Sequence, residues 1–321
     1  MDVLHQPGDC LPPPGGCVVT IGAYDGVHLG HRRLIARVRA TAAELGCASA
    51  VVTFDRHPAA VVRPESAPLL LTDLDQKLEL LAGTGVDVTT VVHFDEVRSR
   101  ETAEEFVRDV LVECLGARAV VVGHDFHFGY GRAGDVPLLQ RMGAELGFDV
   151  TGIHLYSGGH GGGAVSSTRI RRLLGEGRVE NAAALLGRPH QVRGVVGHGD
   201  QRGRELGYPT ANVEISKEIQ LPDDGVYAGW FHRADGARHP AALSLGRRPT
   251  FYETAGVSLL EAHLVDFEGD LYDEAARVDF VANLRGQVKY ASAADLIAQM
   301  AVDVAATRTA LQATTPSTTE Q

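Results

Sequence analysis

The stretch GAYDGVHLGH, which runs from Gly22 to His31, decides how the first half of this chain folds. It directly follows the apolar run Val18–Ile21 and leads into a segment whose apolar positions have helical spacing. A glycine-containing turn between a buried strand and a helix can place a phosphate group against backbone N–H groups and a helix N-terminus. His28 and His31 flank Gly30, and imidazoles there can donate to phosphate oxygens and stabilise developing charge. The stretch therefore predicts a phosphate-binding turn at the edge of an α/β sheet.

Two other kinds of site fit this stretch less well. A zinc site would need more ligands, and no nearby Glu or Cys completes the set. A dinucleotide-binding site would need the spacing G-x-G-x-x-G, which Gly22 and Gly26 do not provide, although Asp55 follows the next apolar run. A solvated loop with incidental histidines also stays open when the stretch is taken alone.

Composition favours a soluble enzyme. The chain has 321 residues, enough for two domains that each bury a core. Its net charge of −11 argues against nucleic acid or an anionic membrane as the main partner. No apolar stretch approaches the roughly 20 residues of a membrane span. The four cysteines show no disulfide-rich pattern, which predicts a cytoplasmic protein. Weak self-association is left open.

Apolar runs alternate with amphipathic segments up to residue 186. The runs are Val18–Ile21, Ala50–Phe54, Val88–Val92, Ala119–Val122 and Val150–Ile153. Short, nearly continuous runs of Val and Ile indicate strands that are buried on both faces. Residues 18–186 are therefore predicted to form a doubly wound α/β domain with a parallel sheet and a ligand cleft at the carboxyl ends of its strands. Residues 1–17, rich in proline and glycine, are expected to form a flexible tail.

The pattern changes after Gly187. Residues 192–284 form short β-rich segments between turns, which favours an antiparallel β-barrel. Ser292 with Asp295 predicts the start of a final helix, so the second domain is expected to cover residues 187–312. The polar residues 313–321 are expected to be disordered.

Three further segments of the first domain carry a family pattern. They are TFDRHP at residues 53–58, GHDFHFGYGRAG at residues 123–134 and VSSTRIR at residues 165–171. Together with the His-x-Gly-His turn they resemble the N-terminal module of the bacterial bifunctional riboflavin kinase/FMN adenylyltransferase (FAD synthetase) family. Hydroxyl groups at a helix start can bind phosphate oxygens, and aromatic rings beside glycines suit stacking on a flavin or adenine ring.

The resemblance assigns roles to individual residues of the first domain. It implies that His28 and His31 are catalytic. It implies that ATP and its phosphates contact Gly22, Asp25, Gly30, Ser166, Ser167, Thr168 and Arg169. It implies that the flavin contacts Phe54, His57, Asp125, Phe126 and Phe128. The chain departs from the family at Arg56, where proline is usual, and at His127, where arginine is common.

The second domain resembles riboflavin kinases. The matching segments are GVVGHG at residues 194–199, GREL at 203–206, GYPTAN at 207–212, LPDDGVY at 221–227, LGRRPTF at 245–251 and EAHLVDF at 261–267. The resemblance implies that Gly197 and Gly199 bind ATP, that Thr210 and Asn212 hold Mg²⁺, and that Glu261 is the catalytic base. Hydroxyl and amide oxygens suit Mg²⁺ that bridges ATP phosphates.

Strand geometry adds a prediction about the direction of the Glu261 side chain. Alternation along a strand puts Glu261 and His263 on one face and Asp266 on the other. The resemblance implies that this shared face points into the ligand cleft of the barrel. There a carboxylate can accept the proton of the attacking hydroxyl group.

The resemblance implies two ATP-dependent reactions. The second domain would phosphorylate riboflavin to FMN, and the first would transfer AMP from ATP to FMN, forming FAD and pyrophosphate. Riboflavin, FMN and ATP are then the partners, with Mg²⁺ as the cofactor. The alternative is a flavin- or nucleotide-binding protein, regulatory or pathway-specific, with one inactive module. Arg56 and His127 keep this alternative open.

Overall fold

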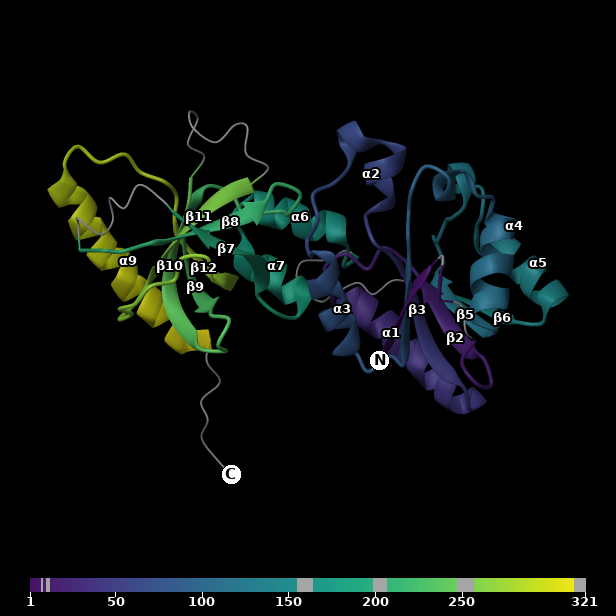
Figure 1. The fold of residues 1–321 in the computed structure, drawn as a ribbon. Coiled ribbons are helices and arrows are strands. Elements are labelled where there is room, and N and C mark those ends of the chain that lie inside the picture. The colour runs from purple at the N-terminus through teal and green to yellow at the C-terminus, as the bar shows by residue number, and fades with distance from the viewer. Residues whose placement is uncertain (7, 10–11, 155–163, 199–206, 247–256, 315–321) are drawn as a thin grey trace, which may run out of the picture. The chain divides into compact units, whose positions relative to one another are not determined.

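The chain folds into two compact units, Met1–Ser167 and Thr168–Gln321 (Figure 1). Each unit is described by itself. The computed structural model describes residues 1–6, 8–9, 12–154, 164–198, 207–246 and 257–314.

The first unit is built on a six-stranded parallel sheet. Its strands are β1 (Asp2–Gln6), β2 (Cys17–Ile21), β3 (Ala48–Phe54), β4 (Val88–Val92), β5 (Ala117–Gly123) and β6 (Asp149–Ile153), in the order β1-β4-β3-β2-β5-β6. The five predicted runs are the strands β2 to β6, which confirms the parallel sheet. The strand order reverses between β2 and β5, so the turn after β2 lies where open α/β sheets bind their ligands.

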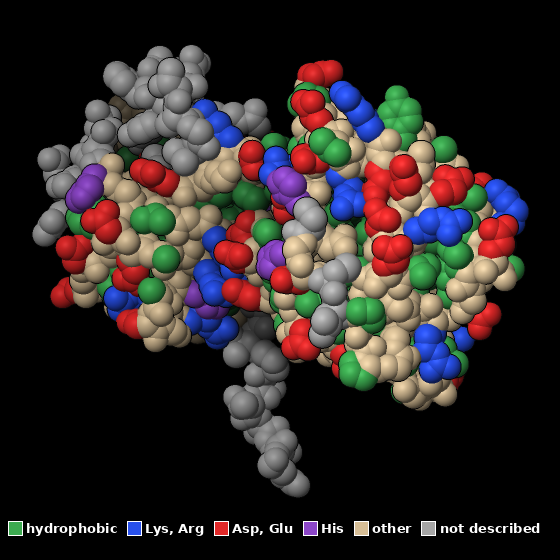
Figure 2. Space-filling view, turned by 45° about the vertical axis from the view of Figure 1, so that its right-hand side comes forward, with side chains coloured by type: hydrophobic (Ala, Val, Ile, Leu, Met, Phe, Trp, Pro, Cys, Tyr) green, Lys and Arg blue, Asp and Glu red, His purple; other side chains and the backbone are tan. Residues whose placement is uncertain are grey.

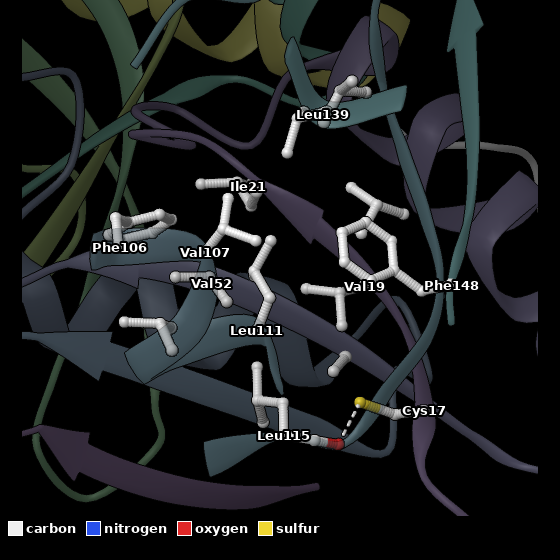
Figure 3. Packing of buried hydrophobic residues seen from close by; sticks show 14 of the residues in the cluster. Cys17, Val19, Ile21, Val52, Phe106, Val107, Leu111, Leu115, Leu139 and Phe148 are labelled. Carbon is white, nitrogen blue, oxygen red and sulfur yellow. Dashed lines mark hydrogen bonds between the residues drawn. The ribbon is translucent and has the colours of Figure 1, made fainter. Parts of the chain in front are cut away.

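Helices cover both faces of this sheet, as a doubly wound fold requires. The helices are α1 (Leu29–Leu45), α2 (Pro58–Val62), α3 (Leu74–Ala82), α4 (Ala103–Phe106) and α5 (Val136–Leu146), with the π-helix η3 (Val107–Cys114) and the 3₁₀ turns η1 (Pro64–Ser66), η2 (Arg98–Arg100) and η4 (Tyr130–Arg132). The clusters of α1 and α3 contain Val18 and Val51 of the sheet. The cluster on the other face contains Val19, Val52 and Leu111 of η3 (Figure 3). Because neighbouring strand residues alternate between the two clusters, the strands are buried on both sides.

The expectation of a flexible tail over residues 1–17 is wrong for its first residues. Residues Asp2–Gln6 form β1, which pairs in parallel with β4 at the edge of the sheet. The amide of His93 donates to the carbonyl of Gln6 at 2.8 Å, and Leu4 packs against the main core. These five residues precede a proline- and glycine-rich stretch, and their own sequence gives only a weak signal for a strand. The partner strand β4, more than 80 residues away in sequence, decides their conformation.

The second unit is a closed antiparallel barrel with a final helix, as predicted. The helices α6 (Ser167–Gly175) and α7 (Val179–Leu186) precede the strands β7 (His190–Gly197), β8 (Ala211–Ser216), β9 (Gly225–His232), β10 (Arg238–Leu245), β11 (Val257–Leu264) and β12 (Ala275–Arg285), and α9 (Ala293–Thr314) follows them. The barrel closes in the order β10-β11-β8-β7-β12-β9. The hydroxyl of Ser292 accepts a hydrogen bond from the amide of Asp295 at the start of α9, and Leu311 near its end packs on Ala228 and Val281. The helix includes residues 313 and 314 of the expected tail, and residues 315–321 lie outside the described part.

The surface and the thiols give three further facts. Acidic and basic side chains are interspersed on the face that Figure 2 shows. Within the described residues, no helix is long and apolar enough to cross a membrane. Cys17 and Cys47 are free thiols.

The helix α7 and the turn before it are bonded to the barrel. The amide of Asn283 on β12 donates to the carboxylate of Glu180 at 3.0 Å, and its side chain donates to the carbonyl of Gly177 at 2.9 Å. Val179 and Leu186 of α7 are buried. The division after Ser167 therefore keeps α6 and α7 with the barrel. The domain boundary expected at Gly187 stays a prediction.

A fragment of residues 168–321 should be more stable than a fragment of residues 187–321. The shorter fragment lacks α7 and exposes barrel surface that the helix covers, at roughly 1.5–3 kcal/mol for each large apolar side chain that loses its burial. Thermal unfolding followed by circular dichroism would show the difference as a lower midpoint for the shorter fragment. Equal midpoints would show that α6 and α7 add nothing to the barrel.

Candidate active sites

The turn between β2 and α1 has a constrained backbone. Tyr24 has φ of 49° and Val27 has φ of 37°, in the left-handed region that side chains other than glycine rarely adopt. Both side chains are buried among Ile35 and Leu81, and the hydroxyl of Tyr24 lies 2.7 Å from that of Thr20. Packing of this kind can maintain strained backbone, and such strain concentrates at functional sites.

Asp25 links the turn to two other segments. Its carboxylate accepts hydrogen bonds from the amides of Leu71 at 2.9 Å and Thr72 at 3.1 Å. Its carbonyl accepts a hydrogen bond from the hydroxyl of Ser167 at 2.9 Å. The hydroxyl of Thr72 in turn accepts from the amide of Gly26 at 3.2 Å. Asp25 was expected to contact ATP, and these contacts show a carboxylate that holds the turn in place.

The two histidines of the turn stack on each other at the start of α1. Their ring centroids lie 3.5 Å apart with 15° between the planes. His28 is the N-cap residue, and its Nδ1 accepts a hydrogen bond from the amide of His31 at 3.3 Å. A Cβ atom on Gly30 would lie 3.2 Å from the ring of His28 and 3.4 Å from the carbonyl of Val165, so only glycine fits here without displacement.

Burial keeps His31 neutral. Desolvation, with smaller contributions from His28 and the charge of Lys77, holds the pKa of His31 well below its usual 6.5. Its Nδ1 is buried and has no hydrogen-bond partner in the described structure. A neutral imidazole that retains hydrogen-bonding capacity beside a helix N-terminus suits a phosphate group.

The predicted Ser-Ser-Thr-Arg segment reaches this turn at its first residues. The hydroxyl of Ser167 contacts Asp25, and the carbonyl of Val165 lies near Gly30, although these pairs are more than 130 residues apart in sequence. Ser166 is half-buried just before α6. Thr168 and Arg169 continue α6 and belong to the second unit, so their phosphate contacts stay predictions.

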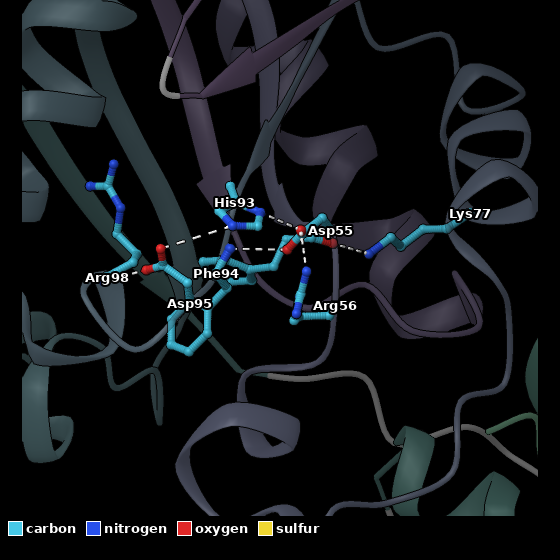
Figure 4. Close-up of polar contacts among 8 residues, drawn as sticks. Asp55, Arg56, Lys77, His93, Phe94, Asp95 and Arg98 are labelled. Atoms are coloured by element: carbon cyan, nitrogen blue, oxygen red, sulfur yellow. Dashed lines mark hydrogen bonds and ion pairs between the residues drawn. The ribbon is translucent and has the colours of Figure 1, made fainter.

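Lys77 is a site residue that sequence reasoning missed (Figure 4). It lies on α3, and its ammonium donates to the carbonyl of Phe54 at 2.6 Å and to that of Ala23 at 3.4 Å. It thereby links the end of β3 to the turn after β2. Burial lowers the pKa of Lys77 to about 8, although Asp25 and Asp55 oppose the shift. The sequence carried one signal for this role: Lys77 lies three residues after Leu74, within the apolar stripe of the helix, where a buried side chain is expected.

Asp55 lies beside Lys77 in the same view and gathers polar partners from two strand ends. Its carboxylate is 2.7 Å from Nδ1 of His93 and accepts from the amide of Phe94 at 2.9 Å. Arg56 pairs with it at 3.4 Å and leaves 52% of its side chain exposed. The family departure at Arg56 therefore places an exposed cation at the rim of the strand ends.

The expected flavin residues lie in two groups. Phe54 ends β3 and meets the ring of Phe94 edge-on at 5.3 Å. His57 caps α2, and its Nδ1 accepts from the amide of Ala59 at 3.1 Å. The local role of His57 is thus that of a helix cap, and its flavin contact stays a prediction.

The second group follows β5. The rings of Phe126 and Phe128 stack at 5.3 Å with 12° between their planes. Gly129 has φ of +70°, and a Cβ atom there would lie 2.6 Å from the backbone nitrogen of Ala103, so this bend requires glycine. Asp125 is exposed, and its carbonyl lies 2.8 Å from Nδ1 of His127. The departure at His127 is therefore an exposed side chain that contacts its own loop.

The predicted residues of the barrel form a row across neighbouring strands. Glu261 on β11 lies directly opposite Asn212 on β8 and opposite Ser244 on β10. Gly197 on β7 lies opposite Asn212 on its other side. Directly opposed residues point to the same face of an antiparallel sheet, so Asn212 and Glu261 are neighbours. Thr210, half-buried, comes two residues earlier.

This row lies on the outer face of the barrel. Leu260 and Ala262, on either side of Glu261, are fully buried, and they pair with the buried Val213 and Leu243. These residues fill the barrel interior, so Glu261 and His263 point outward and are half-buried. The expectation that both share a face is confirmed. The cleft that they would line is on the outside of the barrel, because the inside is packed with apolar side chains.

Comparisons with known proteins cover both units of the chain. Residues 12–169 match the FAD synthetase family, and residues 186–311 match the riboflavin kinase family. The chain is 39% identical over 292 residues to a bifunctional riboflavin kinase/FMN adenylyltransferase of Escherichia coli K12, covering 91% of both proteins. It is 40% identical over 308 residues to the Pseudomonas fluorescens protein of the same name, covering 96% of this chain and 97% of that protein. This chain belongs to the bifunctional riboflavin kinase/FMN adenylyltransferase family.

A solved structure shares the architecture of this family member. It is the crystal structure of a protein from Streptococcus pneumoniae that is named a macrolide-efflux protein. It is 28% identical, with a TM-score of 0.84 over 96% of this chain and 99% of that one. Its name refers to efflux, whereas both family matches name flavin enzymes. The chain therefore carries two activities, riboflavin kinase and FMN adenylyltransferase, that act on riboflavin, FMN and ATP. The FAD synthetase match covers most of the first unit, and the riboflavin kinase match covers the barrel and most of α9.

Some predicted residues of this enzyme fall outside the described structure. They are Gly199, residues 203–206 of the expected glycine-rich segment, and residues 247–251. Within the described part, no three His, Cys, Asp or Glu side chains are grouped as a metal site. Thr210 and Asn212 offer hydroxyl and amide oxygens instead, which are ligands that suit Mg²⁺.

The stability of the first unit should rise with pH between about 8 and 10.5 relative to a Lys77→Met variant. The folded state loses the Lys77 proton near pH 8 and the unfolded chain near pH 10.5, so the unfolded state binds more protons in this window. The wild type bears a desolvation cost of about 3 kcal/mol below pH 8 that disappears above pH 10.5. Calorimetry of both proteins from pH 7 to 10.5 would measure the changing difference.

The exposed Lys217 provides the control for this comparison. The Lys217→Met variant removes an exposed amine and reports any general effect of a lysine-to-methionine replacement over the same pH range. A constant difference for Lys77→Met would show that the buried amine has an ordinary pKa.

Proposed function

We propose that the turn from Gly22 to His31 and the start of α6 form the adenylylation site. The stacked imidazoles of the buried His28 and the half-buried His31 at the N-terminus of α1 are the observation that carries this proposal. They adjoin the helix amides that favour anions, and the hydroxyl of Ser167 contacts the same turn. This arrangement supports binding of the ATP phosphates at the strand-order switch point of the sheet.

The proposed reaction requires little covalent chemistry from the protein. A phosphate oxygen of FMN attacks the α-phosphorus of ATP, the bond to the β-phosphate oxygen breaks, and pyrophosphate leaves. Charge develops on the phosphate oxygens, and His28 and His31 donate to these oxygens in a site where water is excluded. Ser166, Thr168 and Arg169 supply further donors in the proposal. The rings of the proposed flavin residues then hold the isoalloxazine ring, with Phe126 and Phe128 as a stacked pair.

Replacing both histidines of the turn should separate the two activities. In the His28→Ala/His31→Ala variant, we expect formation of FAD from FMN to fall by at least about 10²-fold, because donors to the developing charge are lost. Formation of FMN from riboflavin should continue at its normal rate. Chromatography of the flavins after incubation with ATP and Mg²⁺ measures both. The exposed His5→Ala variant is the control, and loss of both products in a folded double variant would contradict separate sites.

We also propose that the outer face of the barrel phosphorylates riboflavin, with Glu261 as the general base. The terminal hydroxyl of the ribityl chain attacks the γ-phosphorus of ATP, its proton goes to Glu261, and ADP leaves. The register of Glu261 opposite Asn212 supports this proposal, because it brings a base and an oxygen ligand to adjacent positions. Thr210 and Asn212 would hold Mg²⁺, and Gly197 would leave room for the nucleotide. The ion supplies positive charge beside the transferred phosphoryl group when it is bound.

A Glu261→Gln variant should lose kinase turnover by about 10²–10⁴-fold, because the amide keeps the size of the side chain and cannot accept the proton. Riboflavin binding, followed by flavin fluorescence, should change little. The exposed Glu268→Gln variant, seven residues further along, is the matched control. Near-normal turnover of Glu261→Gln would overturn the role of Glu261 as base.

The proposal places both reactions in the cytoplasm, where ATP is available. The alternative of a protein with one inactive module gains no support, because both family matches are present and the relatives are named for both activities. Arg56 and His127 are exposed side chains beside the expected flavin residues. Both are therefore compatible with an active first unit.

A further inference from the structure

The strand pairing of β8 and β11 stops between Asn212 and Thr210, the two residues proposed to hold the metal. The last paired residues are Ala211 and Ala262. Thr210 comes next on one side and His263 on the other. Pro209, one residue further, has no N–H group to continue the ladder.

A side chain holds the chain where the ladder ends. Nδ1 of His263 lies 2.8 Å from the carbonyl oxygen of Pro209. Because a carbonyl oxygen only accepts hydrogen bonds, Nδ1 of His263 carries the proton and donates. The ring of Tyr208 meets the ring of His263 edge-on at 5.2 Å. His263 therefore contacts both residues that precede Thr210.

The same strand presents Glu261 on the same face. Glu261 is two residues before His263 and lies opposite Asn212. The segment Tyr208–Asn212 is thus fixed to β11 at two places, by strand pairing at Asn212 and by the His263 side chain at Pro209. Thr210 lies between these two places.

We propose that His263 is a positioning residue of the kinase: its Nδ1–H group holds Pro209 and thereby fixes Thr210 relative to Glu261. This inference rests on the proposed kinase site. One such hydrogen bond contributes only modestly to the stability of the fold. A displacement of about 1 Å at a phosphoryl-transfer site can lower turnover by about 10²-fold. The effect on turnover should therefore exceed the effect on stability.

The test compares two replacements of His263 in the full-length chain. In His263→Asn the side-chain amide nitrogen takes the approximate place of Nδ1 and can still donate. In His263→Leu no donor remains. We expect kcat for riboflavin phosphorylation to fall at least tenfold in His263→Leu, with the KM for riboflavin nearly unchanged, and to recover most of its value in His263→Asn. Adenylylation of supplied FMN reports on the integrity of the chain and should be normal in both variants.

A matched control removes another outward-facing imidazole of the barrel. His232 on β9 bonds to Asp279 on β12 at 2.8 Å, and these two strands carry none of the proposed kinase residues. His232→Leu should leave kinase turnover unchanged. Wild-type kcat in His263→Leu would overturn the inference, and so would a His263→Asn variant as impaired as His263→Leu. If Glu261 is not the base, the Glu261→Gln variant keeps normal kinase turnover, and this result is obtained independently of the His263 variants.

Discussion

The hydrogen bonds of Asp25 are the constraint on which the proposed adenylylation site depends. One residue joins the turn after β2 to Leu71 and Thr72 through its carboxylate and to Ser167 through its carbonyl. These three partners are 46, 47 and 142 residues away in sequence. A buried carboxylate needs such donors, because an unpaired one would be costly. Satisfying Asp25 therefore assembles the walls of the site around the turn.

The two sites rest on different structural principles. The proposed adenylylation site is formed by loops at the carboxyl ends of parallel strands, and burial keeps His31 in it neutral. The proposed kinase site is set by strand register, since Asn212 and Glu261 are opposite each other on a closed barrel. A shift of one residue would turn Glu261 into the apolar interior. The buried Leu260 and Ala262 make that shift unfavourable, so the packed core protects the register of the site.

In each unit, one side chain links two segments of the backbone near the proposed site. Lys77 joins the end of β3 to the turn after β2 through two carbonyl groups. His263 joins β11 to the segment before β8 through one carbonyl group. In each case a side chain bonds to backbone where regular pairing has ended. Backbone carbonyls need hydrogen-bond partners, and in these places a side chain from a neighbouring segment supplies the donor.

The sequence by itself determined the order of the two folds, five of the six parallel strands, the closed barrel with its final helix, and the motifs that identify the family. These features follow from local periodicity and short-range spacing, which can be read from the sequence before the fold is known. Only the tertiary structure decided the edge strand β1, the outward direction of Glu261, and the roles of Asp25, Lys77 and His263 as links. Each depends on a partner far away in sequence or on which face of a strand the core fills, and local pattern holds neither kind of information.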